Sequence, residues 1–284
     1  QADIKTFSAL GVYGTSVLTA ITAQNSYGVQ AVHEVPAEMV DAQIVSLMSD
    51  PGLGVDFAKT GMLYSSAVIE VVAQALTRYH IPFVLDPVMR AGSGGILLEG
   101  NASKTLIKQL LPLCRVVTPN VYEASFISGM EIKDKEDARE AALKLHAMGA
   151  SAVIIKGGHL EDELATGKAT DLLYDGEFEE ISMPAVKRAK IIHGAGCSFS
   201  AALAAELAMD KPLRDAAFSA KKFVHEALSG GNEVSTMVVV NQGYGVRRDA
   251  DRYRTLENVK EAVRMLKKMD GFAKIIPEVG TNIG

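Results

Sequence analysis

Short apolar runs alternate along the chain with segments whose apolar residues recur at helical spacing. In order, these segments are 57–60 (strand), 66–79 (helix), 82–89 (strand), 103–111 (helix), 115–118 (strand), 134–148 (helix) and 152–155 (strand). Strands that are separated by helices usually pair in parallel, because a parallel connection needs the length of a crossover helix. This alternation predicts an α/β protein with a central, mostly parallel sheet and helices on both faces.

Other segments are predicted to surround this sheet. The runs at 170–174 and 177–181 are joined by Asp175-Gly176, a dipeptide typical of tight hairpin turns, and they would add antiparallel strands at an edge. Further strands are predicted at 16–23 and 237–240, and further helices at 2–10, 36–48, 199–208 and 213–228.

The stretch 189–208 runs through His193-Gly194-Ala195-Gly196-Cys197-Ser198 into a helix of small apolar residues. Gly194 and Gly196 have no Cβ, so a ligand can approach the main chain, and the free N–H groups of the first helical turn can bind an anion. Cys197 lies just inside this positive end, a setting that lowers the pKa of a thiol. Alternatively, the glycines serve only tight helix packing and Cys197 is a small buried apolar residue.

Polar side chains follow several predicted strands at their carboxyl ends, where open α/β sheets bind ligands. They are Gln24, Asp86, Asn120 with Glu123, and Lys156. Asp86 could organise a cation or phosphate, or it could belong to a simple Asp-Pro turn. Asn120 and Glu123 could face hydrated Mg²⁺, or they could form a helix-capping box. Lys156 could neutralise phosphate, or it could be a solvated lysine.

The functional interpretation of these residues is stronger because several strand ends indicate the same kind of site. An anion-binding helix start, a nearby cation, carboxylates suited to Mg²⁺ and the lack of a P-loop together favour ATP-dependent phosphoryl transfer outside the Walker class. Catalysis would then consist mainly of positioning and charge stabilisation.

The composition excludes several other classes of function. The net charge is -5 and no basic run is present, which argues against binding to nucleic acid or to a membrane surface. No apolar run approaches the ~20 residues of a membrane span, and no signal peptide opens the chain. Cys114 and Cys197 are far apart and lack metal spacing, so the cytoplasm is the expected location.

Several runs carry a family resemblance. They are residues 1–11, Thr22-Ala23-Gln24-Asn25, Lys59-Thr60-Gly61-Met62-Leu63, Thr118-Pro119-Asn120, Lys156-Gly157-Gly158-His159 and His193-Gly194-Ala195-Gly196-Cys197. Over about residues 1–245 the chain resembles the hydroxymethylpyrimidine and hydroxymethylpyrimidine-phosphate kinases of thiamin biosynthesis, which are ribokinase-like. The resemblance implies ATP-dependent phosphorylation of 4-amino-5-hydroxymethyl-2-methylpyrimidine and then of its monophosphate, in an enzyme that forms a homodimer.

On the acceptor side, the resemblance implies that Asp3, Gln24 and Met62, with the backbone near Val88, hold the aminopyrimidine. The amide of Gln24 can both donate to a ring nitrogen and accept from the exocyclic amine. Cys197 takes the place of the aspartate base of most ribokinase relatives and would accept the proton of the hydroxymethyl group. The second acceptor is already a phosphate oxygen, so its need for a base should be smaller.

On the donor side, the resemblance implies that Asp86, Asn120, Glu123 and Lys156 serve ATP and Mg²⁺, with Asp86 and Glu123 as the metal ligands. The segment 194–196 would form the anion hole for the transferred phosphoryl group. Ala195 departs from the family pattern, since many relatives have threonine there; one hydroxyl donor is lost but the backbone donors stay.

The two ends of the chain also depart from the usual kinase. Relatives carry a first strand and a Gly-Gly-Ala-Gly-Ile segment just before the residue that matches Gln1, so the N-terminal strand is expected to be missing. Residues 1–245 are expected to form the kinase domain and the charged run 246–255 a linker. Residues 256–284 resemble the start of the thiamin-phosphate synthase domain that follows this kinase in some archaea and bacteria.

Two rival interpretations stay open at this point. A pyridoxal kinase would share the fold and sometimes the acceptor. A binding or regulatory module that had lost catalysis would bind pyrimidine or nucleotide without turnover.

Overall fold

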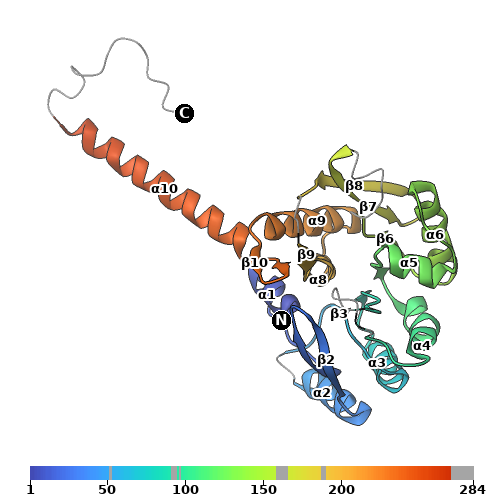
Figure 1. The fold of residues 1–284 in the computed structure, drawn as a ribbon. Coiled ribbons are helices and arrows are strands. Elements are labelled where there is room, and N and C mark those ends of the chain that lie inside the picture. Colours follow the sequence, from blue (N-terminus) through green and yellow to red (C-terminus); the bar gives the residue numbers. More distant parts are fainter. Residues whose placement is uncertain (51–52, 91–94, 96, 158–165, 187–189, 270–284) are drawn as a thin grey trace. The chain divides into compact units, whose positions relative to one another are not determined.

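The computed structural model describes residues 1–50, 53–90, 95, 97–157, 166–186 and 190–269 (Figure 1). The chain divides into two compact units, Gln1–Gly243 and Tyr244–Gly284. The described helices are α1 (Ala2–Ala9), α2 (Ala37–Ser49), α3 (Ser66–Arg78), α4 (Ala102–Gln109), η1 (Leu111–Leu113), α5 (Val121–Ser128), α6 (Lys135–Ala147), α8 (Ala195–Ala208), α9 (Leu213–Ser229) and α10 (Tyr244–Lys267). The described strands are β1 (Ala20–Asn25), β2 (Gly28–Glu34), β3 (Ala58–Thr60), β4 (Phe83–Leu85), β5 (Val116–Val117), β6 (Val153–Ile155), β7 (Lys168–Tyr174), β8 (Phe178–Pro184), β9 (Ile191–His193), β10 (Asn232–Val234) and β11 (Met237–Val239).

A six-stranded sheet in the order β3-β4-β5-β6-β7-β8 forms the centre of the first unit. Strands β3 to β6 pair in parallel, whereas β7 and β8 are antiparallel and pair Tyr174 with Phe178 across the Asp175-Gly176 turn. The prediction of a mostly parallel sheet with an antiparallel edge hairpin is therefore confirmed.

Side-chain alternation in the short strands separates two hydrophobic cores, one on each face of the sheet. In β4, Phe83 and Leu85 belong to the core that is shared with α3, α4, α5 and α6, whereas Val84 belongs to the core that is shared with α8 and α9. Val116 and Val117 divide between the two cores in the same way. The helices thus cover both faces of the sheet, as expected (Figure 1).

Helix α8 lies close to the sheet because its inward residues are small. Ala201, Ala202, Ala204 and Ala205 are buried, and the helix contacts β3 and β4 while packing between α1 and α9. Alanine keeps the distance between helix and sheet short and has the highest helix propensity. The N-terminus of α8 is consequently held near the carboxyl ends of the central strands.

The strand predicted at 16–23 is observed at Ala20–Asn25, and it lies outside the central sheet. Strand β1 pairs antiparallel with β2 in a separate two-stranded sheet, so Gln24 lies within a hairpin and not at the end of a strand of the central sheet. The predicted position of Gln24 is therefore wrong. The run Gly28–Glu34 pairs with its sequence neighbour after a short turn, and this local pairing keeps both strands out of the parallel sheet.

The second unit contains α10. The charged run 246–255, predicted as a linker, is helical and lies inside this helix. Oppositely charged residues three apart, such as Arg252 and Asp249 (3.9 Å) and Lys260 and Glu257 (2.8 Å), support a solvent-exposed helix. The segment 276–284, which carries much of the resemblance to a second domain, lies outside the described residues. None of the described helices is both long and apolar enough to cross a membrane.

A buried ion pair joins α9 to the sheet. Lys221 Nζ lies 2.6 Å from Asp171 Oδ1, and the two side chains are 11% and 3% exposed. The same oxygen accepts a hydrogen bond from the backbone N–H of Gly157 at 2.9 Å, directly after β6. A buried carboxylate needs such partners because it has lost its hydration.

Replacing Lys221 by methionine should therefore destabilise the fold strongly. Asp171 would lose its counter-charge in a buried position, and we expect the free energy of unfolding to fall by about 3–5 kcal/mol, measured by chemical denaturation. The matched control is Lys144→Met in α6, whose exposed ammonium lies 3.7 Å from Glu140. That change should cost at most about 0.5 kcal/mol. Equal losses in the two variants would contradict the role given to the buried pair.

Candidate functional site

Asp86 occupies the centre of a buried cluster of charged side chains. It directly follows β4, and its side chain is 2% exposed. Its Oδ1 accepts a hydrogen bond from Lys156 Nζ at 2.9 Å, and its Oδ2 accepts one from Ser200 Oγ at 2.8 Å. Lys59 Nζ lies 3.9 Å from Oδ2. One carboxylate therefore joins the end of β6, the first turns of α8 and strand β3.

Asn120 and Glu123 lie beside this cluster and form the capping box of α5. Glu123 Oε2 accepts from the Asn120 backbone N–H at 2.9 Å, and Asn120 Oδ1 accepts from the Glu123 backbone N–H at 2.8 Å. Asn120 also bridges to Lys156 in parallel register. Burial raises the pKa of Glu123, while the Lys156 ammonium lowers it and the Asp86 carboxylate raises it further. The capping interpretation is thus correct, and the same carboxylate also faces the charged cluster.

Lys59 is a member of this cluster that the sequence reasoning did not identify. Its side chain is 2% exposed, and its Nζ donates to Asp3 Oδ2 at 3.1 Å and Oδ1 at 3.2 Å. Burial lowers the pKa of Lys59, but Cys197, Asp86 and Asp3 raise it, and the pKa lies above its usual value. Asp3 comes from α1, so Lys59 ties the first helix of the chain to the sheet.

The register of the sheet explains why Lys59 points into the site. Lys59 pairs with Val84, which belongs to the core under α8 and α9, and side chains paired in register share a face. In the sequence, a lysine within the run 57–60 is typical of an exposed strand position. The only available signal was its membership of the run Lys59-Thr60-Gly61-Met62-Leu63. Ser200 was missed for a similar reason, because it lies in an apolar helix.

The N-terminus of α8 opens toward the same cluster. Its N-cap residue is Gly194, with φ +89°, and no side chain caps the helix. The N–H groups of the first turn therefore have no side-chain partner, which is the arrangement that an anion-binding helix start requires. A Cβ added at Gly196 would lie 3.3 Å from Lys156 Nζ, which shows how closely that ammonium approaches the helix start.

The expectation that the pKa of Cys197 is lowered is wrong. Burial raises the pKa of its thiol above the usual value, and the Lys59 ammonium, which opposes this, does not overcome it. Asp86 and Asp3 raise the pKa further, while Lys156 lowers it. The thiolate is thus the minor form at neutral pH.

The remaining predicted residues come from the loop after β3, the segment after β4 and the hairpin of β1 and β2. The carbonyl of Met62 accepts a hydrogen bond from Thr19 Oγ1 at 2.6 Å, which fixes the loop after β3, and half-buried Val88 follows Asp86 by two residues. Gln24 is exposed, and within the described part of the chain no hydrogen bond or ion pair joins it to the charged residues. Gly158 and His159 lie outside the described residues, as does most of the Gly-rich loop after Arg90.

The chemistry of the carboxylates suits a Mg²⁺–nucleotide complex better than an ion held by the protein alone. In the part of the chain that the structure describes, no group of three or more His, Cys, Asp or Glu side chains is placed to hold a metal. Asp86 and Glu123 supply oxygen ligands, but both oxygens of Asp86 already accept hydrogen bonds. Mg²⁺ usually takes one or two carboxylates and completes its shell with phosphate and water.

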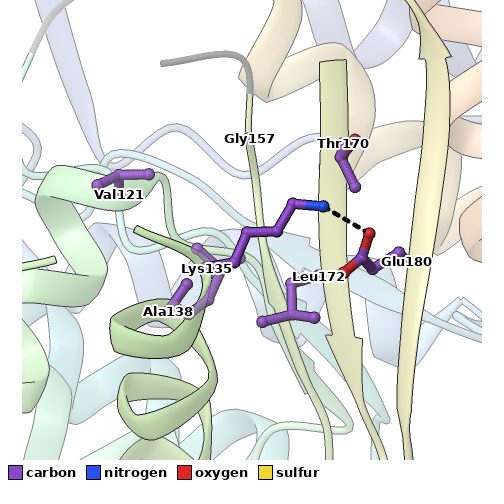
Figure 2. A pocket seen from close by; sticks show the side chains of 8 residues that line it. Val121, Lys135, Ala138, Gly157, Thr170, Leu172 and Glu180 are labelled. Atoms are coloured by element: carbon purple, nitrogen blue, oxygen red, sulfur yellow. Dashed lines mark hydrogen bonds and ion pairs between the residues drawn. The ribbon is translucent and has the colours of Figure 1, made fainter. Parts of the chain in front are cut away.

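A small hollow lies next to the end of β6 (Figure 2). Its lining residues are Val121, Lys135, Ala138, Ile155, Gly157, Thr170, Leu172 and Glu180. Figure 2 shows Lys135 and Glu180 pointing toward each other, with 2.8 Å between Nζ and Oε2. None of the predicted site residues lines this hollow, although Gly157 directly follows Lys156.

Alanine substitutions at the two glycines should separate stability from anion binding. At Gly194 a side chain must adopt a left-handed conformation 3.2 Å from Val240 Cγ2, so we expect Gly194→Ala to lose about 1–2 kcal/mol of unfolding free energy. Gly196→Ala should change stability less than Gly194→Ala, because alanine favours the helix and this partly offsets the crowding of the Lys156 ammonium. It should nevertheless weaken ATP binding, measured by calorimetry, because its Cβ displaces the Lys156 ammonium. Unchanged ATP affinity in Gly196→Ala would contradict this geometry.

Comparisons with known proteins agree with this architecture. The sequence pattern of the phosphomethylpyrimidine kinase family matches residues 1–242. A hydroxymethylpyrimidine/phosphomethylpyrimidine kinase of Rhizobium meliloti is 44% identical over 247 residues, which cover 86% of this chain and 89% of the relative. A thiamine biosynthesis bifunctional protein of Geobacter sulfurreducens is 44% identical over 230 residues, which cover 80% of this chain but only 46% of that protein.

Solved structures show the same fold. The pyridoxal kinase of Bacillus subtilis, in an ADP complex, superposes with a TM-score of 0.76 at 36% sequence identity, and the match covers 86% of this chain and 91% of that one. The fold is thus ribokinase-like, as the resemblance implies. The matched family, the relatives and the shared fold together show that this chain is a kinase and that it belongs to the phosphomethylpyrimidine kinase family.

Proposed function

We propose that this kinase transfers the γ-phosphoryl group of ATP to 4-amino-5-hydroxymethyl-2-methylpyrimidine, and then phosphorylates the resulting monophosphate to the pyrophosphate. The observation that carries this proposal is the buried pair of lysines that approach the two oxygens of Asp86, beside the uncapped N-terminus of α8. Such a site can neutralise several phosphate groups at once. Relatives that are named as kinases of both pyrimidines support the choice of acceptor.

On the donor side, Lys156 and the first-turn N–H groups of α8 bind the phosphates of ATP. Lys156 is directed by its hydrogen bond to Asp86, and its backbone N–H donates to Pro119 O at 2.8 Å. Asp86 and Glu123 would hold Mg²⁺, which neutralises phosphate charge when it is bound. Asn120 keeps Glu123 in place through the capping box. The solved neighbours in complex with ADP or an ATP analogue support this side of the proposal.

On the acceptor side, Asp3, Met62 and the backbone near Val88 hold the aminopyrimidine, and Gln24 joins them as the family resemblance implies. Asp3 is 38% exposed and can turn from Lys59 toward a ligand. Cys197 then accepts the proton of the hydroxymethyl group while the oxygen attacks the phosphorus atom. Since its pKa is raised, the base works from a minor thiolate population.

Pyridoxal phosphorylation is the second candidate function. It is favoured by the solved pyridoxal kinases that superpose on this chain and by a pyridoxine kinase of Bacillus subtilis that is 41% identical over 233 residues. A module that binds pyrimidine or nucleotide without turnover is the alternative from another class.

Several wider features of the enzyme belong to the same proposal. The segment 256–284 is proposed, from its resemblance alone, to be the start of a thiamin-phosphate synthase domain. We expect a homodimer, as in ribokinase-like relatives. The two cysteines are unpaired, which fits a reducing cytoplasm.

Turnover assays distinguish these candidates. The chain, supplied with Mg²⁺ and ATP, should phosphorylate the hydroxymethylpyrimidine and its monophosphate with a kcat/KM well above that for pyridoxal, measured by ADP release and product chromatography. A preference for pyridoxal would establish the second candidate. If calorimetry shows ATP binding but no acceptor is turned over, even by a longer chain that includes upstream residues, the chain is a binding module without catalysis.

The role of Cys197 predicts a pH dependence that differs between the two acceptors. Because its pKa is raised, the thiolate fraction grows with pH, and kcat/KM for the hydroxymethyl acceptor should rise by about tenfold per pH unit above neutrality. Cys197→Ala should abolish this slope and lower the rate about 100-fold. The monophosphate acceptor needs no strong base, so Cys197→Ala should lower its kcat/KM by a smaller factor. Equal losses with both acceptors, or an unchanged slope, would count against Cys197 as the base.

A further inference from the structure

We propose that Lys59 binds the phosphate group of the monophosphate acceptor, so that one site can serve both phosphorylations. This inference rests on the proposed function, since it concerns the second of its two acceptors. Lys59 is an almost completely buried cation to which the proposed reaction has so far given no individual role.

The two lysines approach different oxygens of Asp86. Lys156 bonds to Asp86 Oδ1 and lies next to Gly196 at the helix start and to Glu123, which places it on the donor side. Lys59 lies near Asp86 Oδ2 and donates to Asp3, and of the two ammonium groups it interacts more strongly with Cys197. The acceptor oxygen must lie near Cys197, so Lys59 is the cation on the acceptor side.

The charges around the acceptor make this cation necessary. The cluster contains three carboxylates and two ammonium groups, namely those of Asp3, Asp86, Glu123, Lys59 and Lys156. A neutral hydroxymethyl group can enter such a site without electrostatic penalty. A phosphate monoester carries about two negative charges at neutral pH and would be repelled by Asp3 and Asp86. Lys59 stands between these two carboxylates and can offset that repulsion.

The geometry leaves the Lys59 ammonium able to bind a new partner. Its 3.9 Å separation from Asp86 is too long for a hydrogen bond, and a lysine has three donors. A Cβ added at Gly61 would lie 3.1 Å from Lys59 Nζ, so the lack of a side chain at this position lets the ammonium lie directly against the loop. Gly61 is followed by Met62, which the family resemblance assigns to the aminopyrimidine. The Lys59 ammonium therefore lies against the loop that the resemblance assigns to the acceptor.

The test compares the two acceptors in one variant. Lys59→Met should lower kcat/KM for the monophosphate by about 100-fold and that for the hydroxymethylpyrimidine by at most about tenfold. The matched control is Lys156→Met, which should lower both values by the same factor because it acts on ATP. Lys59→Arg keeps the charge and should retain most of the turnover of the monophosphate.

A binding measurement separates this role from a merely structural one. Without ATP, calorimetry should show that Lys59→Met weakens binding of the monophosphate by a much larger factor than binding of the hydroxymethylpyrimidine, which loses only the support that Lys59 gives to Asp3. Lys59→Gln, which can still donate to Asp3, repeats the comparison if the methionine variant does not fold. An equal loss for both acceptors, in turnover or in binding, would overturn the proposal. A wild-type chain that phosphorylates neither acceptor would instead refute the proposed function.

Discussion

The two oxygens of Asp86 accept hydrogen bonds from Lys156 after β6 and from Ser200 in α8, and Lys59 of β3 approaches one of them. A carboxylate at this depth is stable only because every side of it is partnered. These same contacts hold the start of α8, Lys156 and Lys59 in fixed relation. Positions within about an ångström matter for phosphoryl transfer, since catalysis there consists mainly of positioning and charge stabilisation.

The shortness of the central strands makes this arrangement possible. Strand β5 has only two residues, and β3, β4 and β6 have three each, so polar residues reach the site immediately after buried ones. Alternation then decides the face on which each side chain lies. Val84 packs under α8, and Lys59 lies beside it in register and reaches the site from the same face. The pairing register of β3 and β4 therefore places both the core residue Val84 and the charged residue Lys59 on the same face of the sheet.

The site serves two acceptors that differ in charge, and in our proposal Cys197 and Lys59 address this difference. Cys197 is buried enough for its pKa to be raised, so its thiolate is a scarce but strong base, which suits a neutral alcohol. Lys59 supplies positive charge between two carboxylates, which suits a phosphate monoester. In our proposal the first acceptor depends more on the base and the second more on the cation.

Much of this could be predicted from local pattern. The alternation of strands and helices, the edge hairpin around Asp175-Gly176, the helix after Gly194 and the polar residues at the ends of β4, β5 and β6 are all signals within a few residues of the chain. Only the tertiary structure showed that Lys59 lies beneath α8, that the strand containing Gln24 leaves the central sheet, and that burial raises the pKa of Cys197. Helical and strand periodicity arise from neighbouring residues, whereas register, burial and electrostatic environment depend on segments that are distant in sequence and meet only when the chain packs.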